Sequence, residues 1–196
     1  MRFAPGARRL ALPPGLAAVA LLPVAPVGSA VAAVAGLAVL WFHRDPDRSP
    51  PDGAGYLAPA DGTVTVLREE DGRVRVGVFM NVTDVHVNRA PVAGEVEGVE
   101  HVPGANRPAF SKESDRNERV HVDLGEARVT LIAGWFARRI HPAVEPGDRV
   151  ARGERIGHVS FGSRADVLFP PGVAMADVAV EKGETVRAGE TILASP

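Results

Sequence analysis

The sequence predicts a mainly β fold, a flattened lipoyl/biotinyl-like β-sandwich (barrel-sandwich hybrid), preceded by a hydrophobic helical membrane segment. Three observations predict it: short alternating runs between Gly and Pro turns, an internal repeat in the last third, and a long uncharged stretch near the N-terminus. A chain of 196 residues suits one domain with an appendage. We therefore expect a membrane-associating segment over residues 1–44 and a β domain over residues 45–196.

The N-terminal stretch, residues 10–42, contains no charged side chain. About 20 apolar residues cross a bilayer, so its length allows one crossing. Four prolines and Gly28-Ser29 interrupt it, and both a kinked helix and a shallow hairpin of two short segments fit. A cleaved signal peptide is the alternative, but the run continues to Trp41-Phe42, an aromatic pair typical of a membrane boundary. Arginines on both sides favour placing both ends on the cytoplasmic face of the cell membrane.

From residue 55 onward the pattern is that of β-strands. Residues 63–67 and 73–79 alternate in polarity, and Asp71-Gly72 between them is a typical hairpin turn. Residues 92–102 suggest a further pair of strands, and residues 103–119 a long loop.

An internal repeat of the form E-x-G-[DE]-x-V-x-x-G-E-x-I occupies residues 145–156 and again residues 181–192. Repeated Gly-acidic turns that join short Val/Ile strands predict the lipoyl/biotinyl type of sandwich. Gly162-Ser163 lies between the two copies.

Composition excludes several function classes. Net charge is −2, from 22 basic and 24 acidic residues, without a basic patch, so nucleic acid is not an expected partner. The absence of cysteine excludes disulfides, cysteine nucleophiles and cysteine metal ligands. His86, His121 and His141 stand singly, without the close pairing of a zinc site, and no metal is expected.

Gly162-Ser163 is the most informative dipeptide, although most Gly-Ser pairs are simple turns. Glycine permits unusual backbone geometry, in which the Ser163 hydroxyl can attack the Gly162 carbonyl and convert the amide to an ester. β-Elimination of that ester cuts the chain and leaves dehydroalanine, which hydrolyses to a pyruvoyl group. Such a carbonyl forms a Schiff base with an amine and acts as an electron sink.

Three further features are candidates for the same chemistry. Strict alternation places His86 on one face of an extended run with Asp84 and Asn88. Asp61 begins an Asp-Gly pair, which by itself indicates a turn. Arg138 and Arg139 are either solvated charge or a clamp for an anion.

Three function classes remain open on these residues. A lipoyl or biotin carrier explains the repeat but needs a hairpin lysine, where the connector between the copies offers Met175-Ala176-Asp177. A lysostaphin-like zinc peptidase shares the G-D-x-V-x-x-G-x-x-I-G phrase but needs a His-x-His after Gly-Ser, and no histidine follows residue 164. The third class is a self-processing pyruvoyl decarboxylase that acts on a membrane substrate.

The chain resembles the small form of the phosphatidylserine decarboxylase family, and especially its archaetidylserine decarboxylase branch. Nearly the whole chain carries the resemblance, because six phrases occur in the family's order. They are FHRDP (42–46), APADG (58–62), DVHVNRAP (84–91), NER (117–119), ARRI (137–140) and FGSR (161–164).

The resemblance implies a lyase made as a proenzyme that cleaves itself between Gly162 and Ser163. The products would be a β chain, residues 1–162, and an α chain, residues 163–196, which begins with a covalently bound pyruvoyl group derived from Ser163. His86 matches the histidine linked to decarboxylation as proton donor, and Asp61 the aspartate linked to self-cleavage. Longer members carry a second histidine where this chain has Arg89, so Asp61 and His86 both remain candidates for the base.

The implied substrate is a serine phospholipid, phosphatidylserine or archaetidylserine, converted to the ethanolamine lipid. Arg138 and Arg139 are then candidates for holding its phosphate or carboxylate. The expected partners are this lipid, the membrane and the two chains of the proenzyme, and a homo-oligomer is compatible with the sequence.

Overall fold

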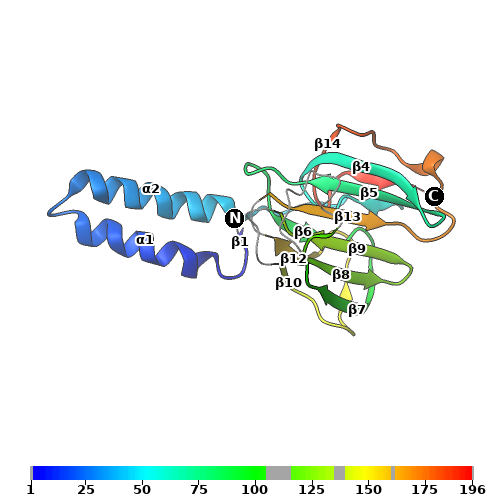
Figure 1. Cartoon of the computed structure of the whole chain (residues 1–196), viewed down its shortest axis with the longest axis horizontal. Helices are drawn as coiled ribbons and strands as arrows, with labels where there is room; N and C mark the ends of the chain where they lie inside the picture. The colour runs from blue at the N-terminus through cyan, green and yellow to red at the C-terminus, as the bar shows by residue number, and fades with distance from the viewer. Residues whose placement is uncertain (1, 105–115, 135–139, 160–161, 196) are drawn as a thin grey trace. The chain divides into compact units, whose positions relative to one another are not determined.

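A computed structural model describes residues 2–104, 116–134, 140–159 and 162–195. The chain divides into two compact units, Met1–Asp47 and Arg48–Pro196. The first unit is helical and the second is built from strands (Figure 1). Each unit is described by itself below.

The first unit is a hairpin of two helices, α1 (Ala7–Leu21) and α2 (Pro26–Phe42), and its ends join through β1 (Arg2–Phe3) and β2 (Arg44–Asp45). Proline at the first turn of α2 suits that position, where its missing N–H costs no helical hydrogen bond. The Ser29 hydroxyl of α2 donates to the Ala18 carbonyl of α1 at 2.6 Å and ties the helices together. The uncharged stretch therefore forms two helices and not one kinked helix.

The outside of this helical hairpin is apolar. Its exposed large hydrophobic side chains are Leu10, Leu12, Leu16, Val19, Leu22, Val24, Val27, Val31, Val34, Leu37 and Trp41. Within the described ranges, neither of these helices nor any other combines the length and the apolar character needed to cross a membrane.

In the part of the second unit that the structure describes there are thirteen strands and one short 3₁₀ helix, η2 (Met175–Asp177). The strands are β3 (Tyr56–Leu57), β4 (Gly62–Glu70), β5 (Arg73–Phe79), β6 (Val87–Arg89), β7 (Gly94–Val102), β8 (Arg119–Leu124), β9 (Ala127–Ile132), β10 (Ile140–Pro142), β11 (Arg149–Val150), β12 (Arg155–Val159), β13 (Arg164–Leu168), β14 (Thr185–Val186) and β15 (Ile192–Ala194).

These strands form a large curled sheet and two small ones. The eight-stranded sheet has the order β11-β7-β8-β9-β13-β5-β4-β14, a three-stranded sheet the order β10-β12-β6, and β15 pairs with β3. Every pairing is antiparallel, and β13 lies between β5 and β9 in the middle of the large sheet (Figure 1). The predicted mainly β class is confirmed.

Two local predictions have different outcomes. Asp71 and Gly72 both have positive φ, 52° and 72°, and join β4 to β5 as the predicted hairpin turn. The expected strand pair over residues 92–102 is wrong, because β7 runs through this segment as one strand. Its pairing with β8 shifts register between Val96 and Gly98, so Gly98 accommodates a bulge and not a turn.

The two repeat copies adopt the same local structure. The Gly147 N–H donates to the Val96 carbonyl and the Gly183 N–H to the Val64 carbonyl, both at 2.8 Å. The first copy thus adds β11 to β7, and the second adds β14 to β4. Equivalent turns at equivalent sheet edges explain why the sequence repeats.

Alternation along β13 separates core from outer face. Ala165 and Val167 are fully buried in the main hydrophobic core, so Arg164 and Asp166 lie on the opposite face of the sheet. Gly77 of β5 pairs with Asp166, and a Cβ at Gly77 would lie 2.5 Å from the Asp166 carboxylate. Glycine at this position makes room for the buried carboxylate of Asp166, three residues after Ser163.

Candidate active site

Ser163 lies where the chain passes from β12, in the three-stranded sheet, to β13, in the large sheet. It is fully buried, and its carbonyl accepts a hydrogen bond from the Met80 N–H at 2.9 Å. Its hydroxyl lies 3.9 Å from the Met80 sulfur, a weak acceptor. Gly162 has φ +66°, in the left-handed region that favours glycine. The dipeptide thus lies between strands of two sheets, and Ser163 is buried there with one weak acceptor near its hydroxyl.

His86 immediately precedes β6 and is 3% exposed. Its Nδ1 lies 3.0 Å from the Asp84 carbonyl, which can only accept, so this contact places a proton on Nδ1. Proton exchange then falls to Nε2. The His86 carbonyl accepts from the N–H of Val159, the last residue of β12, at 3.2 Å. His86 is therefore fixed to the strand that leads into the Gly162-Ser163 crossing.

The predicted alternation of Asp84, His86 and Asn88 in one extended run is wrong at Asp84. This residue lies in a turn, and its carboxylate accepts the Asn81 N–H at 2.7 Å. Aspartate favours such turns because its side chain can bond nearby backbone. His86 and Asn88 are both buried, the latter fully.

Asp61 is held by two donors. Its carboxylate accepts from the Arg48 guanidinium at 2.7 Å and from the Ala188 N–H at 2.8 Å. Arg48 also pairs with Glu190 at 2.9 Å. Among the described residues, the Ser163 hydroxyl is not a partner of this carboxylate. The adjoining Gly62 passes against the Phe79 carbonyl, where a Cβ would overlap, so the backbone at this point is close to Met80.

Arg89, at the position of the second histidine of longer relatives, is 4% exposed and donates to the Gly153 carbonyl at 3.0 Å. Guanidinium groups stay protonated in proteins, so this side chain cannot act as a base. Arg138 and Arg139 lie outside the described residues.

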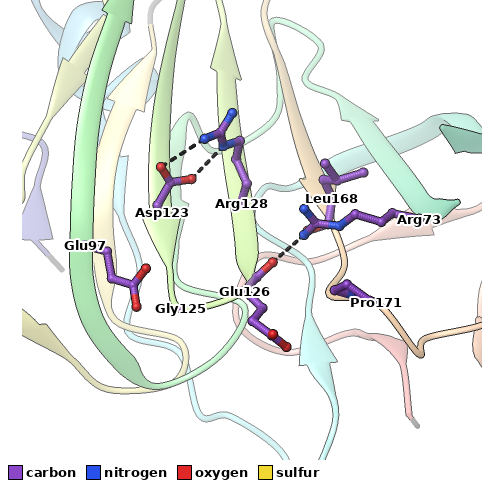
Figure 2. A pocket seen from close by; sticks show the side chains of 8 residues that line it. All are labelled: Arg73, Glu97, Asp123, Gly125, Glu126, Arg128, Leu168 and Pro171. Atoms are coloured by element: carbon purple, nitrogen blue, oxygen red, sulfur yellow. Dashed lines mark hydrogen bonds and ion pairs between the residues drawn. The ribbon is translucent and has the colours of Figure 1, made fainter. Parts of the chain in front are cut away.

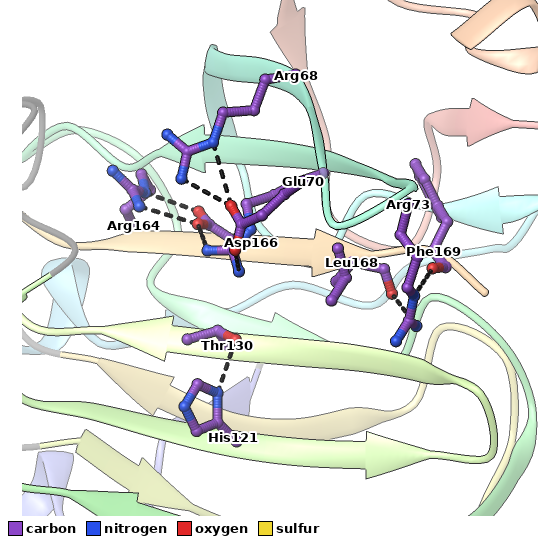
Figure 3. A network of polar contacts seen from close by, with 10 residues as sticks. Arg68, Glu70, Arg73, His121, Thr130, Arg164, Asp166, Leu168 and Phe169 are labelled. Atoms are coloured by element: carbon purple, nitrogen blue, oxygen red, sulfur yellow. Dashed lines mark hydrogen bonds and ion pairs between the residues drawn. The ribbon is translucent and has the colours of Figure 1, made fainter. Parts of the chain in front are cut away.

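A buried ion-pair network begins one residue after Ser163 (Figure 3). Arg164 binds both carboxylate oxygens of Asp166, at 2.7 and 2.9 Å, and their side chains are 3% and 1% exposed. Arg75 adds a longer contact to Asp166 at 3.4 Å and a short one to Glu70 at 2.7 Å. This network fixes the start of β13, directly after Ser163.

A histidine lies on the same face as the network. The His121 ring contacts the Thr130 hydroxyl at 2.9 Å (Figure 3). Burial lowers the pKa of His121, and the nearby Arg128 and Arg119 lower it further. The ring is therefore neutral at pH 7.

A cavity of about 440 Å³ opens at the opposite end of β13 (Figure 2). Its wall includes Arg73, whose guanidinium donates to the Glu126 carbonyl, and the bidentate pair of Asp123 with Arg128. It also includes Leu168, five residues after Ser163 and therefore about 16 Å along the strand. This cavity is therefore not adjacent to the Gly162-Ser163 bond.

Among the described residues, no group of three or more His, Cys, Asp and Glu side chains is arranged to hold a metal ion. His141 and His158 stack with ring centroids 4.6 Å apart. Sequence reasoning missed Met80, which contacts both Ser163 and Asn88. No sequence signal marks it, because sheet pairing alone brings these residues together.

Known proteins resemble this chain over most of its length. The family model described as phosphatidylserine decarboxylase matches residues 36–194. A putative archaetidylserine decarboxylase proenzyme of Halobacterium salinarum is 62% identical, over 95% of each chain. A phosphatidylserine decarboxylase proenzyme of Thermobifida fusca is 55% identical, over 83% of this chain and 75% of the relative.

A more distant relative also matches most of the chain. A putative archaetidylserine decarboxylase proenzyme of Methanosarcina mazei is 42% identical, over 88% of this chain and 80% of the relative. No solved structure matches. The family match selects the decarboxylase among the three function classes open from the sequence, and the chain belongs to the phosphatidylserine decarboxylase family.

Proposed function

We propose that this chain is a proenzyme that cleaves itself between Gly162 and Ser163 and then decarboxylates a serine phospholipid with a pyruvoyl group derived from Ser163. One observation carries the proposal: a buried serine follows a left-handed glycine at the crossing between two sheets, in a chain of this family. The surroundings fit a small ketone, because the Ser163 side chain has one weak sulfur contact to lose among the described residues.

Self-cleavage begins with attack of the Ser163 oxygen on the Gly162 carbonyl carbon. The oxygen–carbon bond forms, the carbon–nitrogen bond breaks, and the hydroxyl proton passes to the nitrogen. Elimination then removes the Cα proton of residue 163, breaks its Cβ–O bond and releases the Gly162 carboxylate. Water addition and loss of ammonia leave the ketone. His86 and Asp61 are the proposed proton carriers, and Asp61 must first loosen its contact with Arg48.

In the mature enzyme the pyruvoyl carbonyl would supply an electron sink for the carbon–carbon bond that breaks on release of carbon dioxide. His86, once it carries a second proton on Nε2, donates that proton to the carbon that loses the carboxylate and returns to the neutral form, while the Asp84 carbonyl holds Nδ1–H. The closed, buried setting of His86 restricts water, so the proton comes from the side chain.

The substrate head group is proposed to be phosphoserine, and the product head group phosphoethanolamine. Relatives named for archaetidylserine and for phosphatidylserine both match well, so the head group and not the tail is the shared chemistry. Arg138 and Arg139 are proposed to bind the phosphate or carboxylate, because guanidinium groups bind both in bidentate fashion.

The helical hairpin is proposed to associate with the cell membrane from the cytoplasmic face. Its exposed leucines and valines form an apolar surface that water does not stabilise. Arginines flank both ends of the uncharged stretch, which favours the cytoplasmic side for both. Residues 1–44 are proposed as the membrane part and residues 45–196 as the catalytic part. A membrane-held enzyme meets a lipid substrate without extracting it.

The β unit is proposed to be a barrel-sandwich hybrid of the lipoyl/biotinyl type. The two repeat copies form matching turns, and their second glycines, Gly153 and Gly189, face each other, because a Cβ added at Gly189 would lie 3.5 Å from the Gly153 Cα. This arrangement supports a two-fold relation between the halves, as that fold class requires.

Two measurements test the proposal. Intact mass of the purified chain should show two fragments, residues 1–162 and residues 163–196, the second beginning with a ketone in place of the amino group of residue 163. The same preparation should release carbon dioxide from vesicles that contain phosphatidylserine or its ether-linked archaeal counterpart. A single unbroken chain with an ordinary serine rules the proposal out.

Replacing His86 by Ala is expected to leave part of the self-cleavage intact and to lower carbon dioxide release by about 10²- to 10⁴-fold, the usual contribution of a general acid. The measurement is head-group decarboxylation per cleaved chain. His101→Ala is the control, because His101 is largely exposed on β7 and pairs with Glu118 at the surface. Unchanged turnover in the His86 variant removes this residue from the mechanism.

A further inference from the structure

Asn88 of β6 is a fully buried side chain whose carbonyl oxygen accepts no hydrogen bond among the described residues. Its amide nitrogen makes two long contacts, to the Pro59 carbonyl at 3.4 Å and to the Met80 sulfur at 3.6 Å. Most buried polar groups in proteins are hydrogen-bonded, so an unsatisfied acceptor calls for an explanation.

The amide orientation is fixed by its surroundings. Rotating the carboxamide by half a turn would place its oxygen against the Pro59 carbonyl, which is also an acceptor. The nitrogen therefore faces Pro59 and the sulfur, and the oxygen remains without a donor. Misassignment of the two atoms does not account for the unsatisfied oxygen.

Ser163 contacts the same sulfur atom. Its hydroxyl lies 3.9 Å from the Met80 sulfur, and its carbonyl is bonded to the Met80 N–H at 2.9 Å. Met80 is itself fully buried. One thioether thus contacts both a hydroxyl that has only this weak acceptor and the amide group of Asn88, whose oxygen has no donor. The Asn88 oxygen lacks a donor and the Ser163 hydroxyl lacks a strong acceptor, so the two groups are complementary in hydrogen bonding.

We propose that Asn88 is a positioning residue for self-cleavage, and that its side-chain oxygen takes over the Ser163 hydroxyl from the Met80 sulfur when that hydroxyl attacks Gly162. The inference rests on the proposed function. A neutral amide cannot remove the proton, so Asn88 orients the O–H while the base carries the proton to the nitrogen of residue 163. The bonds that form and break are those of the self-cleavage step described above: the oxygen–carbon bond forms and the carbon–nitrogen bond breaks.

Asn88→Leu tests this role, because leucine keeps the volume and removes both polar atoms. We expect self-cleavage to slow by about 10- to 100-fold, the range for a misplaced reacting group. The rate is followed by denaturing electrophoresis after synthesis is stopped. Asn88→Asp keeps an oxygen at the same place and should cleave faster than the leucine variant. Asn88→Ala, which adds no bulk, should cleave as slowly as the leucine variant.

A second readout separates positioning from support of the fold. Because the Asn88 oxygen has no partner to lose and its nitrogen makes only two long contacts, Asn88→Leu in an uncleavable Ser163→Ala chain should leave the urea midpoint unchanged or raise it. Asn117 is the matched control, since it is equally buried but its amide donates to the Ala133 carbonyl at 2.8 Å, so Asn117→Leu should lower the midpoint.

The outcomes divide cleanly. Wild-type cleavage rates in a folded Asn88→Leu or Asn88→Ala chain overturn the role of Asn88 and leave the proposed function standing. A wild-type chain that stays in one piece overturns the proposed function, and this inference with it. If Asn88→Leu lowers the urea midpoint as far as Asn117→Leu does, Asn88 supports the fold and does not position Ser163.

Discussion

Ser163→Ala is expected to give one unbroken chain with no detectable cleavage at any time after synthesis. Without the hydroxyl no atom can attack the Gly162 carbonyl, and the ketone cannot form. Carbon dioxide release should fall to the uncatalysed level, a loss of about 10⁶-fold or more. Intact mass and a vesicle assay measure the two losses on the same sample.

The chain offers a matched control, because it contains a second Gly-Ser pair at Gly28-Ser29. That pair lies inside α2, and its hydroxyl donates to the Ala18 carbonyl. Ser29→Ala should cleave at the wild-type rate. Ser163→Cys retains a nucleophile and should cleave in part. Full cleavage of Ser163→Ala, or loss of cleavage in Ser29→Ala, would contradict the assigned bond.

Asp166→Ala is expected to destabilise the β unit by about 3–5 kcal/mol, the cost of removing one partner from a buried ion pair. Arg164 would lose both of its bonds to the carboxylate while its side chain stays 3% exposed. The effect falls on the first residues of β13, so retention of residues 163–196 after cleavage should weaken as well. The urea midpoint in the Ser163→Ala background measures the first effect, and size exclusion of the cleaved enzyme the second.

The pair of Asp123 with Arg128 is the control for burial. It is also bidentate, at 2.6 and 3.1 Å, but it joins β8 to β9, and its side chains are 27% and 41% exposed. Asp123→Ala should therefore cost no more than about 1 kcal/mol. Equal losses for the two aspartates would show that burial of the Arg164 pair contributes nothing.

Most of the fold class could be predicted from the sequence, because it depends on local patterns. Alternation, Asp71-Gly72 and the repeat identified strands and turns before their partners were known. The error at residues 92–102 arose because a glycine in a strand signals a turn and a bulge alike. Only pairing with β8 distinguishes them.

The site could be predicted only as a set of candidates. The sequence identified Ser163, His86 and Asp61, but not their partners. Asp61 contacts Ala188, 127 positions later, and Ser163 contacts Met80, 83 positions earlier. Such contacts depend on strand order and register, which local patterns do not determine.

By itself the sequence determined that this is a mainly β member of the phosphatidylserine decarboxylase family with an apolar N-terminus, since composition, periodicity and motif order are properties of the chain alone. Of its two Gly-Ser pairs, motif order already pointed to Gly162-Ser163. Only the tertiary structure shows the surroundings of the two pairs, with Gly28 inside a helix and Gly162 at positive φ between strands of two sheets. The same folding brought Met80 to Ser163 and Asn88 to Met80, because antiparallel pairing joins strands that lie far apart along the backbone.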